Sequence, residues 1–289
     1  MNKPDYLAPK TLDEAFSALK GNTGQMKIIA GGTDLVPRMR AGVYKPELLI
    51  DLQKLELNEI VEEDGWIRIG AYVTHTEILD SKILSEKFPA LIEATSDIAG
   101  PPIRNRGTLG GNLVNASPAA DLATPLIAYD AEAVISSLKG DRIVPLGEFF
   151  TAPGRTVLEL DEILTAVRIP KMSTRTAAKF IKLGKRKAMA IAVVSAAVRI
   201  SLAEDGTINA ARIALGSVAP VPLRIEKAES VLEGEKPGEE LFAQAGKTAS
   251  DETKPITDLR STADYRKKMV AVLTRRALAG AWELLKVET

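Results

Sequence analysis

The sequence contains no cysteine and only one histidine, His75, among its 289 residues. Without cysteine the chain forms no disulfide, has no thiolate nucleophile and cannot ligate zinc or an iron–sulfur cluster through sulfur. A single histidine excludes a multi-histidine metal centre, and a Ser-His-Asp triad would have to use His75. We therefore expect no metal site in this chain.

Aromatic residues are scarce, at 4%, and the formal net charge is zero, with 38 basic and 38 acidic residues. Nucleic-acid surfaces use an excess of cations, and base-stacking platforms use aromatic side chains. No stretch approaches the roughly 20 apolar residues of a membrane-spanning helix, and residues 1–5 lack the apolar core of a signal peptide. We therefore expect no nucleic-acid partner, no integral membrane segment and a cytoplasmic location.

Hydrophobic residues make up 45% of the chain and charged residues 26%, which is typical of a globular protein. The length is sufficient for two ordinary domains. The first half mixes both kinds of secondary structure. Helices are expected at residues 11–19, 35–40, 76–84 and 90–98, and strands at 26–30, 48–52, 60–61, 66–69, 133–138 and 142–145. Residues 100–118 carry few helix or strand signals and are expected to form a long functional loop.

The pattern changes after about residue 170, where residues 171–174 are interpreted as a linker. Two apolar strands at 191–202 and 208–215, joined by Glu204-Asp205-Gly206, predict a β-meander. Helices are expected at residues 223–232, 239–249 and 263–285. We therefore predict an α+β protein with two domains, residues 1–172 and 173–289.

A first glycine loop, residues 30–34, follows the strand expected at 26–30 and includes Gly31-Gly32-Thr33-Asp34. Glycine permits positive φ and close approach of the backbone to a ligand. Successive backbone N–H groups before a helix can bind phosphate oxygens. The loop has neither the P-loop lysine nor the Rossmann glycine spacing. A phosphate site and a tight strand-to-helix turn are both compatible with this stretch.

A second glycine loop, residues 104–112, contains Gly110-Gly111 and runs on into a polar stretch that ends at Asp121. Hydroxyl groups, side-chain amides and a carboxylate follow one another here, which suits a phosphorylated, polyhydroxylated ligand. Asparagine, glycine and proline are also ordinary turn residues, so a structural loop is the alternative. Two such loops in one domain favour a ligand with several polar segments, such as a dinucleotide.

Several segments together resemble the FAD-binding subunit of the molybdenum hydroxylases. This family includes the medium subunit of aerobic carbon monoxide dehydrogenase and the flavin domain of xanthine dehydrogenase. The matching segments are AGGTDL at residues 30–35, PELLIDL at 46–52, GAYVTHTEI at 70–78, IRNRGTLGGNLVNASPAAD at 103–121 and FIKLGKRKAM at 180–189. The resemblance covers nearly the whole chain.

The resemblance implies an FAD-binding domain of the PCMH or vanillyl-alcohol-oxidase-like type over residues 1–172, with subdomains at about 1–55 and 56–172. A CO-dehydrogenase-flavoprotein-like domain would follow at residues 173–289, with an antiparallel sheet packed against helices. FAD would lie between the two subdomains, with the C-terminal domain closing over the flavin.

The resemblance also implies which residues bind the cofactor. The pyrophosphate would be bound by Ile29, Ala30, Gly31, Gly32, Thr33, Asp34 and Leu35. The phosphates and the ribityl chain would contact Thr108, Gly110, Gly111, Asn112 and Asn115. Asp121 would lie near the ribityl chain and the ring, Ile98 and Leu164 would pack against the cofactor, and Lys182 would reach the flavin, a solvated strand lysine being the alternative. His75 lies in a segment near the cofactor, where we expect it to be structural.

On this basis we predict an FAD-binding electron-transfer subunit with no catalytic side chain of its own. The resemblance implies a heterotrimer, present twice, with a large molybdenum-cofactor subunit and a small [2Fe–2S] subunit. Electrons would pass from [2Fe–2S] through FAD to an external acceptor; NAD, a quinone, ferredoxin and oxygen are all compatible. A self-contained FAD-dependent oxidase or dehydrogenase, or a non-redox nucleotide-binding module, are the alternatives.

Overall fold

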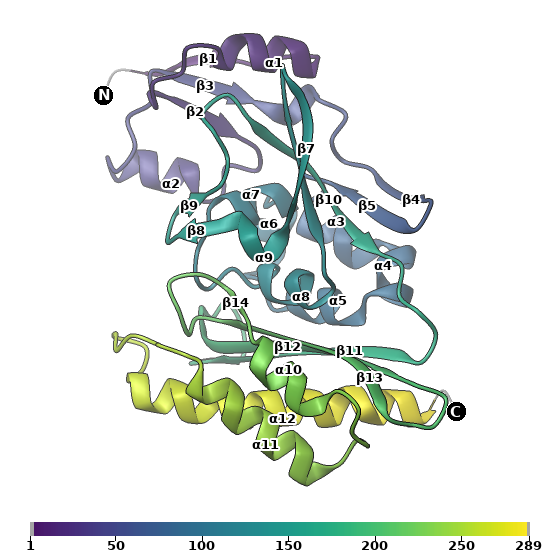
Figure 1. The fold of residues 1–289 in the computed structure, drawn as a ribbon. Coiled ribbons are helices and arrows are strands. Elements are labelled where there is room, and N and C mark those ends of the chain that lie inside the picture. Colours follow the sequence, from purple (N-terminus) through teal and green to yellow (C-terminus); the bar gives the residue numbers. More distant parts are fainter. Residues whose placement is uncertain (1–2, 288–289) are drawn as a thin grey trace.

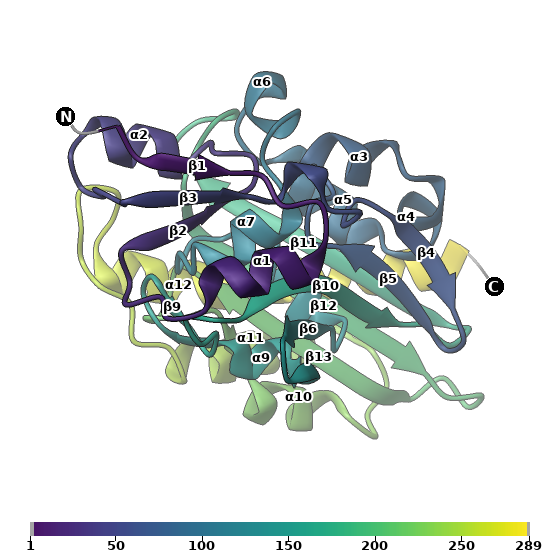
Figure 2. The same cartoon turned by 90° about the horizontal axis from the view of Figure 1, so that it is seen from above.

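Three β-sheets are stacked one above the other in the computed structural model, which describes residues 3–287 (Figure 1). Seen from above, the first sheet lies over the second, and the C-terminal sheet lies below them (Figure 2). Within residues 3–287, no helix combines the length and the apolar composition that a membrane span requires.

The first sheet has three parallel strands in the order β1 (Asp5–Leu7), β3 (Leu48–Asp51) and β2 (Met26–Ile29). Helix α1 (Leu12–Leu19) covers it and begins where the Thr11 hydroxyl accepts the Glu14 N–H at 3.2 Å. Such a cap satisfies one of the free N–H groups of the first turn. A short helix, α2 (Leu35–Arg40), follows β2, and a 3₁₀ turn (Leu52–Lys54) follows β3.

The second sheet is antiparallel and has five strands, with β10 at its centre. Its order is β4 (Ile60–Glu63), β5 (Trp66–Gly70), β10 (Ile163–Pro170), β6 (Glu132–Ser137) and β7 (Gly140–Pro145). Its main helices are α3 (His75–Asp80), α4 (Lys82–Lys87), α5 (Pro89–Ser96) and α8 (Ala123–Ala128). Smaller elements are α6 (Pro101–Arg104), α7 (Leu109–Val114), α9 (Leu146–Phe149), β8 (Phe150–Ala152) and β9 (Arg155–Thr156).

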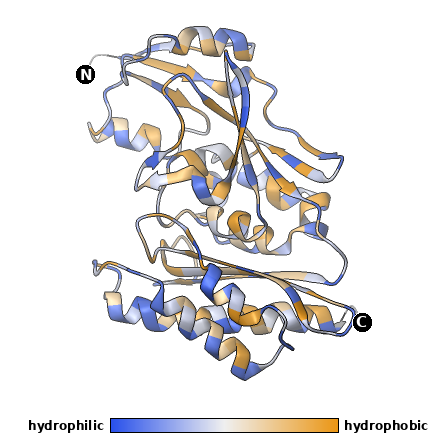
Figure 3. Cartoon of the chain, in the orientation of Figure 1, coloured by the Kyte–Doolittle hydropathy of each residue, from blue (hydrophilic) through white to orange (hydrophobic). Residues whose placement is uncertain are grey.

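The C-terminal sheet is antiparallel, in the order β11 (Thr176–Gly184), β12 (Ala192–Leu202), β13 (Ile208–Gly216) and β14 (Leu223–Arg224). Apolar side chains on one of its faces pack against α10 (Glu226–Leu232), α11 (Glu239–Asp251) and α12 (Ala263–Val287). Its other face shares a core with the second sheet and its helices. Both α11 and α12 carry hydrophilic and hydrophobic residues along their lengths (Figure 3). This is the predicted α+β fold, ending in an antiparallel sheet packed with helices.

The prediction of a loop without regular elements over residues 100–118 is wrong, because α6 and α7 form there. Pro101 and Pro102 begin α6, where proline is tolerated since the first N–H groups of a helix lack partners. The Thr108 hydroxyl caps α7 by accepting the Gly111 N–H at 3.1 Å. Other elements also differ from the prediction. Ser81 divides the helix predicted at 76–84 into α3 and α4, residues 223–224 form a strand, and β10 and β11 were not predicted.

Candidate functional site

The first glycine loop connects the end of β2 to the start of α2. Gly32 has a φ of +72°, a conformation that glycine adopts without strain. The Val36 N–H donates to the Gly32 carbonyl at 3.0 Å and closes the turn. Within the described chain, the four N–H groups of residues 31–34 have no intramolecular acceptor. Four adjacent unpaired donors at a strand-to-helix junction are suited to binding an anion.

The two glycine loops, which are far apart in the sequence, touch each other in the structure. A Cβ atom built on Gly31 would lie 1.8 Å from the carbonyl oxygen of Arg106 and 3.1 Å from Cα of Gly107. No real side chain fits at such a distance, so only glycine allows this contact. The contact between Gly31 and Arg106 therefore fixes the first glycine loop against the second.

The second glycine loop uses its backbone differently from the first. The Leu109 and Gly110 N–H groups donate to Val73 and Ala71 at 2.8 Å each, and the Thr108 carbonyl accepts the Asn112 N–H at 3.0 Å. A Cβ on Gly110 would lie 2.8 Å from the Ala71 carbonyl oxygen, so this glycine serves close packing. These amides are already paired, and the loop presents side chains instead. One of them, Asn112, has a buried Oδ1 without a partner among the described residues.

A buried ion pair joins the C-terminal sheet to the segment that precedes α8. Lys182 Nζ on β11 lies 2.6 Å from Asp121 Oδ2, and the two side chains are only 5% and 11% exposed. Lys182 also donates to the Asp97 carbonyl oxygen at 3.0 Å. Burial raises the pKa of Asp121 to about 6, although the Lys182 ammonium lowers it. Asp121 Oδ1 is buried and has no hydrogen-bond partner within the described residues, which for a buried polar atom requires an explanation.

A cavity of about 330 Å³ adjoins this ion pair. It is lined by Asp97, by the end of β11 from Lys182 onward, and by the turn between β11 and β12, where Lys185, Arg186 and Lys187 add positive charge. The structure thus brings Asp121 and Lys182 together, and Lys182 also lines this cavity. Asp97 was not predicted from the sequence, because it contributes its carbonyl oxygen, which any residue type would supply.

The two predicted apolar contacts lie in the core below the second glycine loop. Ile98 is 8% exposed and Leu164 is 3% exposed, and both belong to the same buried cluster. Leu164 precedes Thr165, whose carbonyl oxygen accepts the Ala71 N–H at 2.9 Å, next to Gly110. Asn115 ends α7 and is half-buried.

His75, at the start of α3, packs directly against the second glycine loop. The backbone N–H of His75 donates to the Gly107 carbonyl at 2.9 Å. The ring carbon Cδ2 of His75 lies 3.0 Å from the position that a Cβ on Gly107 would occupy. Burial, helped by the Arg104 charge, lowers the pKa of His75 to about 4. The ring is therefore neutral at pH 7, and its contacts are those of a packing residue that supports the loop.

The low pKa of His75 predicts a loss of stability in mild acid. The unfolded chain protonates near the ordinary pKa of about 6.5, whereas the folded chain resists protonation until about pH 4. The neutral His75 ring contributes about 3 kcal/mol to the free energy of unfolding above pH 6.5. This contribution is lost as the pH falls toward 4. We expect His75→Gln to lose less unfolding free energy than the wild type between pH 7 and 4.5. If denaturant titrations show that His75→Gln and the wild type lose the same unfolding free energy, the low pKa of His75 is contradicted.

Residues 2–172 match the family model described as FAD binding domain in molybdopterin dehydrogenase. Residues 179–281 match the model of the CO dehydrogenase flavoprotein C-terminal domain. The chain is 36% identical over 279 residues to the carbon monoxide dehydrogenase medium chain of Hydrogenophaga pseudoflava, covering 96% of each. It is 33% identical over 279 residues to the xanthine dehydrogenase FAD-binding subunit of Escherichia coli O157:H7, covering 96% of this chain and 95% of that subunit.

The fold is shared with solved structures over almost the whole length. A structure of carbon monoxide dehydrogenase from Hydrogenophaga pseudoflava, which lacks the Mo-pyranopterin moiety of the molybdenum cofactor, superposes with a TM-score of 0.93 at 35% identity, covering 97% of this chain and 98% of that one. Together, the FAD-binding domain and these likenesses define a flavoprotein component of an oxidoreductase. The chain belongs to the family of FAD-binding medium subunits of the molybdenum hydroxylases.

Proposed function

We propose that this chain binds FAD between its two N-terminal subdomains, within a domain spanning residues 1–172, and relays electrons within a molybdenum hydroxylase complex. The observation that carries the proposal is the row of four unpaired N–H groups at residues 31–34. Their positive dipole ends would bind the pyrophosphate, and the adjoining residues Ile29, Ala30 and Leu35 would shape its surroundings.

The second glycine loop would contact the cofactor mainly through side chains. The buried, unpaired oxygens of Asn112 and Asp121 are acceptors for hydroxyl donors of the kind a ribityl chain supplies. Thr108, Gly110 and Gly111 would hold the loop in position, and Asn115, at the end of α7, would add a further side-chain amide. Ile98 and Leu164 would border the flavin ring with apolar surface.

Lys182 would place a positive charge at the ring edge that becomes electron-rich on reduction. When bound, FAD supplies a carrier that exchanges electrons singly or in pairs. The protein contributes the binding contacts, the exposure of the ring and this charge. Asp121 would hold the Lys182 ammonium in place through their 2.6 Å contact.

The partners in this proposal are a small [2Fe–2S] subunit as electron donor and a large subunit with the molybdenum cofactor. The chain contains no cysteine, so the iron–sulfur ligands must come from another chain. The names of its relatives, a medium chain and an FAD-binding subunit, support the presence of further chains beside this one. A dimer of such heterotrimers is the assembly that we propose.

Replacing Lys182 by methionine is expected to lower the midpoint potential of bound flavin. Methionine has a similar reach but no charge, so the negative charge that reduction adds to the ring is less stabilised. We expect a shift of roughly 30 mV or more, equivalent to about 1.4 kcal/mol for a two-electron couple. Lys171→Met, which removes an ion pair with Glu62 on the second sheet, serves as the control. If Lys182→Met retains FAD and its flavin midpoint potential is unchanged, Lys182 does not act on the flavin ring.

The proposed function as a whole is tested by isolating the native complex. We expect FAD in this chain, and molybdenum and iron in stoichiometric partner subunits, with flavin reduced only when the iron–sulfur subunit is present. A purified chain that takes up no FAD would support a non-redox module. Direct reduction of its flavin by an organic substrate, without partners, would support a self-contained oxidase or dehydrogenase.

A further inference from the structure

Strand β11, which carries Lys182, is at the edge of the C-terminal sheet and pairs only with β12 among the described strands. An edge strand has backbone N–H groups that need another partner or water. Glu93 on α5 supplies one partner, because its Oε2 accepts the Phe180 N–H at 2.9 Å. Its other carboxylate oxygen forms an ion pair with Lys179. One carboxylate thus binds β11 at two consecutive residues.

The alternation of side chains along β11 connects this contact to Lys182. Ala178 and Phe180 are buried in the core shared with the second sheet, whereas Ile181 packs with the C-terminal helices. Since successive side chains in a strand point to opposite faces, Lys182 points the same way as Phe180. Fixing the Phe180 backbone therefore fixes the direction in which the Lys182 side chain leaves the strand.

Helix α5 holds β11 at two points. Glu93, in its last turns, binds Lys179 and Phe180, and Asp97, just after its end, accepts Lys182 through its carbonyl oxygen at 3.0 Å. The Asp121 carboxylate completes the surroundings of the Lys182 ammonium at 2.6 Å. Residues 179, 180 and 182 of β11 are thus held by contacts from α5, from the residue just after it and from the Asp121 carboxylate.

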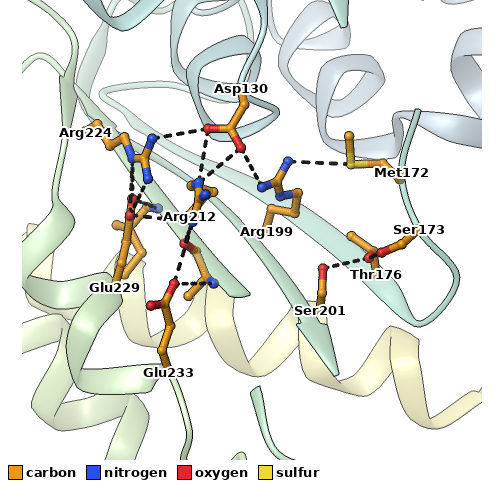
Figure 4. A network of polar contacts seen from close by, with 12 residues as sticks. Asp130, Met172, Ser173, Thr176, Arg199, Ser201, Arg212, Arg224, Glu229 and Glu233 are labelled. Atoms are coloured by element: carbon orange, nitrogen blue, oxygen red, sulfur yellow. Dashed lines mark hydrogen bonds and ion pairs between the residues drawn. The ribbon is translucent and has the colours of Figure 1, made fainter. Parts of the chain in front are cut away.

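The other large polar contact between these layers does not involve β11. Asp130, just after α8, binds Arg199 of β12, Arg212 of β13 and Arg224 of β14 (Figure 4). Arg224 also forms an ion pair with Glu229 on α10, and Arg212 forms one with Glu233 just after this helix. Asp130 therefore anchors β12, β13 and β14 of the C-terminal sheet, whereas Glu93 contacts the edge strand β11.

We propose that Glu93 is a positioning residue for Lys182: by holding the edge of β11 through the Phe180 N–H and Lys179, it keeps the Lys182 ammonium on Asp121 at the flavin site. The inference rests on the proposed function, because Lys182 acts there on bound FAD. Among the described residues, no hydrogen bond or ion pair joins Glu93 to Lys182 or Asp121. Without it, the long Lys182 side chain regains rotamer freedom, which opposes a fixed contact.

The test is a double-mutant cycle on the FAD-loaded full chain, with the flavin midpoint potential as the readout. Glu93→Ala is expected to shift the potential in the same direction as Lys182→Met and by at least half as much. In the Lys182→Met background, Glu93→Ala is expected to add nothing, because the residue acts through Lys182. Glu93→Gln keeps an acceptor for the Phe180 N–H and is expected to recover most of the shift. An unaltered potential in Glu93→Ala, or additive shifts, would overturn the inference.

Glu132→Ala is a matched control, since Glu132 is a similarly buried carboxylate that pairs with Arg168 inside the second sheet. It is expected to lower the melting temperature without moving the potential. The FAD-free chain gives a second readout: in Glu93→Ala the amide of Phe180 should exchange at least about tenfold faster, and the carboxyl titration of Asp121 should move. If the wild type binds no FAD, the proposed function fails. If instead the Phe180 exchange and the Asp121 titration stay unchanged, the positioning role fails.

Discussion

Gly31→Ala is expected to abolish retention of FAD. It adds a single methyl group, and the structure predicts for it a larger functional effect than for the other substitutions considered. The new Cβ would lie 1.8 Å from the Arg106 carbonyl oxygen, which belongs to the backbone and has no flexible side chain to displace. The two glycine loops must separate, and the four N–H groups of residues 31–34 lose their alignment. We expect FAD affinity to fall at least about 100-fold, or roughly 3 kcal/mol, measured as the flavin-to-protein ratio after gel filtration and by titration.

Gly147→Ala is the control for Gly31→Ala, because a Cβ there meets no atom within 4 Å and its φ is not positive. It should retain FAD as the wild type does. Circular dichroism should show that both variants keep their secondary structure. A Gly31→Ala protein with a full complement of flavin would show that the contact between the glycine loops is dispensable for binding.

Asp130→Asn is expected to give the largest loss of stability among these variants. Asp130 is the only carboxylate that Arg199 contacts in the described chain, and the Arg199 side chain is only 10% exposed. Asparagine tolerates the positive φ of 54° at this position and preserves shape, so the change isolates the charge. Breaking a fully buried pair costs about 3–5 kcal/mol. Because Asp130 is partly exposed, we expect about 2 kcal/mol, or a fall in melting temperature of roughly 3 °C.

Arg199→Met in the same chain should restore part of this loss, because it removes the charge that Asp130→Asn leaves unpaired. Asp141→Asn, at an exposed position on β7, should change stability by less than about 0.5 kcal/mol. If Asp130→Asn melts like Asp141→Asn, the arginine cluster of Figure 4 contributes little to the attachment of the C-terminal sheet.

Local patterns predicted most elements of the fold. The helix predicted at residues 11–19 is α1, and the strands predicted at residues 60–61 and 66–69 pair as β4 and β5. The helices in residues 100–118 were missed, because glycine, proline and asparagine dominate there and tertiary contacts decide the outcome. The Gly110 N–H, for example, is paired with Ala71, a residue distant in the sequence.

The two glycine loops could be predicted from the sequence, because a positive φ or a close approach of the backbone favours glycine at those positions. That Gly31 contacts Arg106 was not predictable, since it depends on how the first sheet sits on the second. Glu93 was missed for a related reason. A glutamate within the apolar stretch of α5 is the only local signal, and its partners on β11 lie 86 and 87 residues further along the chain. The resemblance to a family supplied Asp121 and Lys182, which the residues alone would not have paired.

Asp121 and Asp130 lie at opposite ends of the short, fully buried helix α8. One carboxylate faces the proposed cofactor, and the other attaches three strands of the neighbouring sheet. A substitution that shifts α8 would therefore disturb both at once. In a random library screened for temperature-sensitive growth, substitutions in α8 should remove both the yellow colour of bound flavin and the thermal stability of the protein. Substitutions of Asp121 alone or of Asp130 alone should remove only one of these two properties.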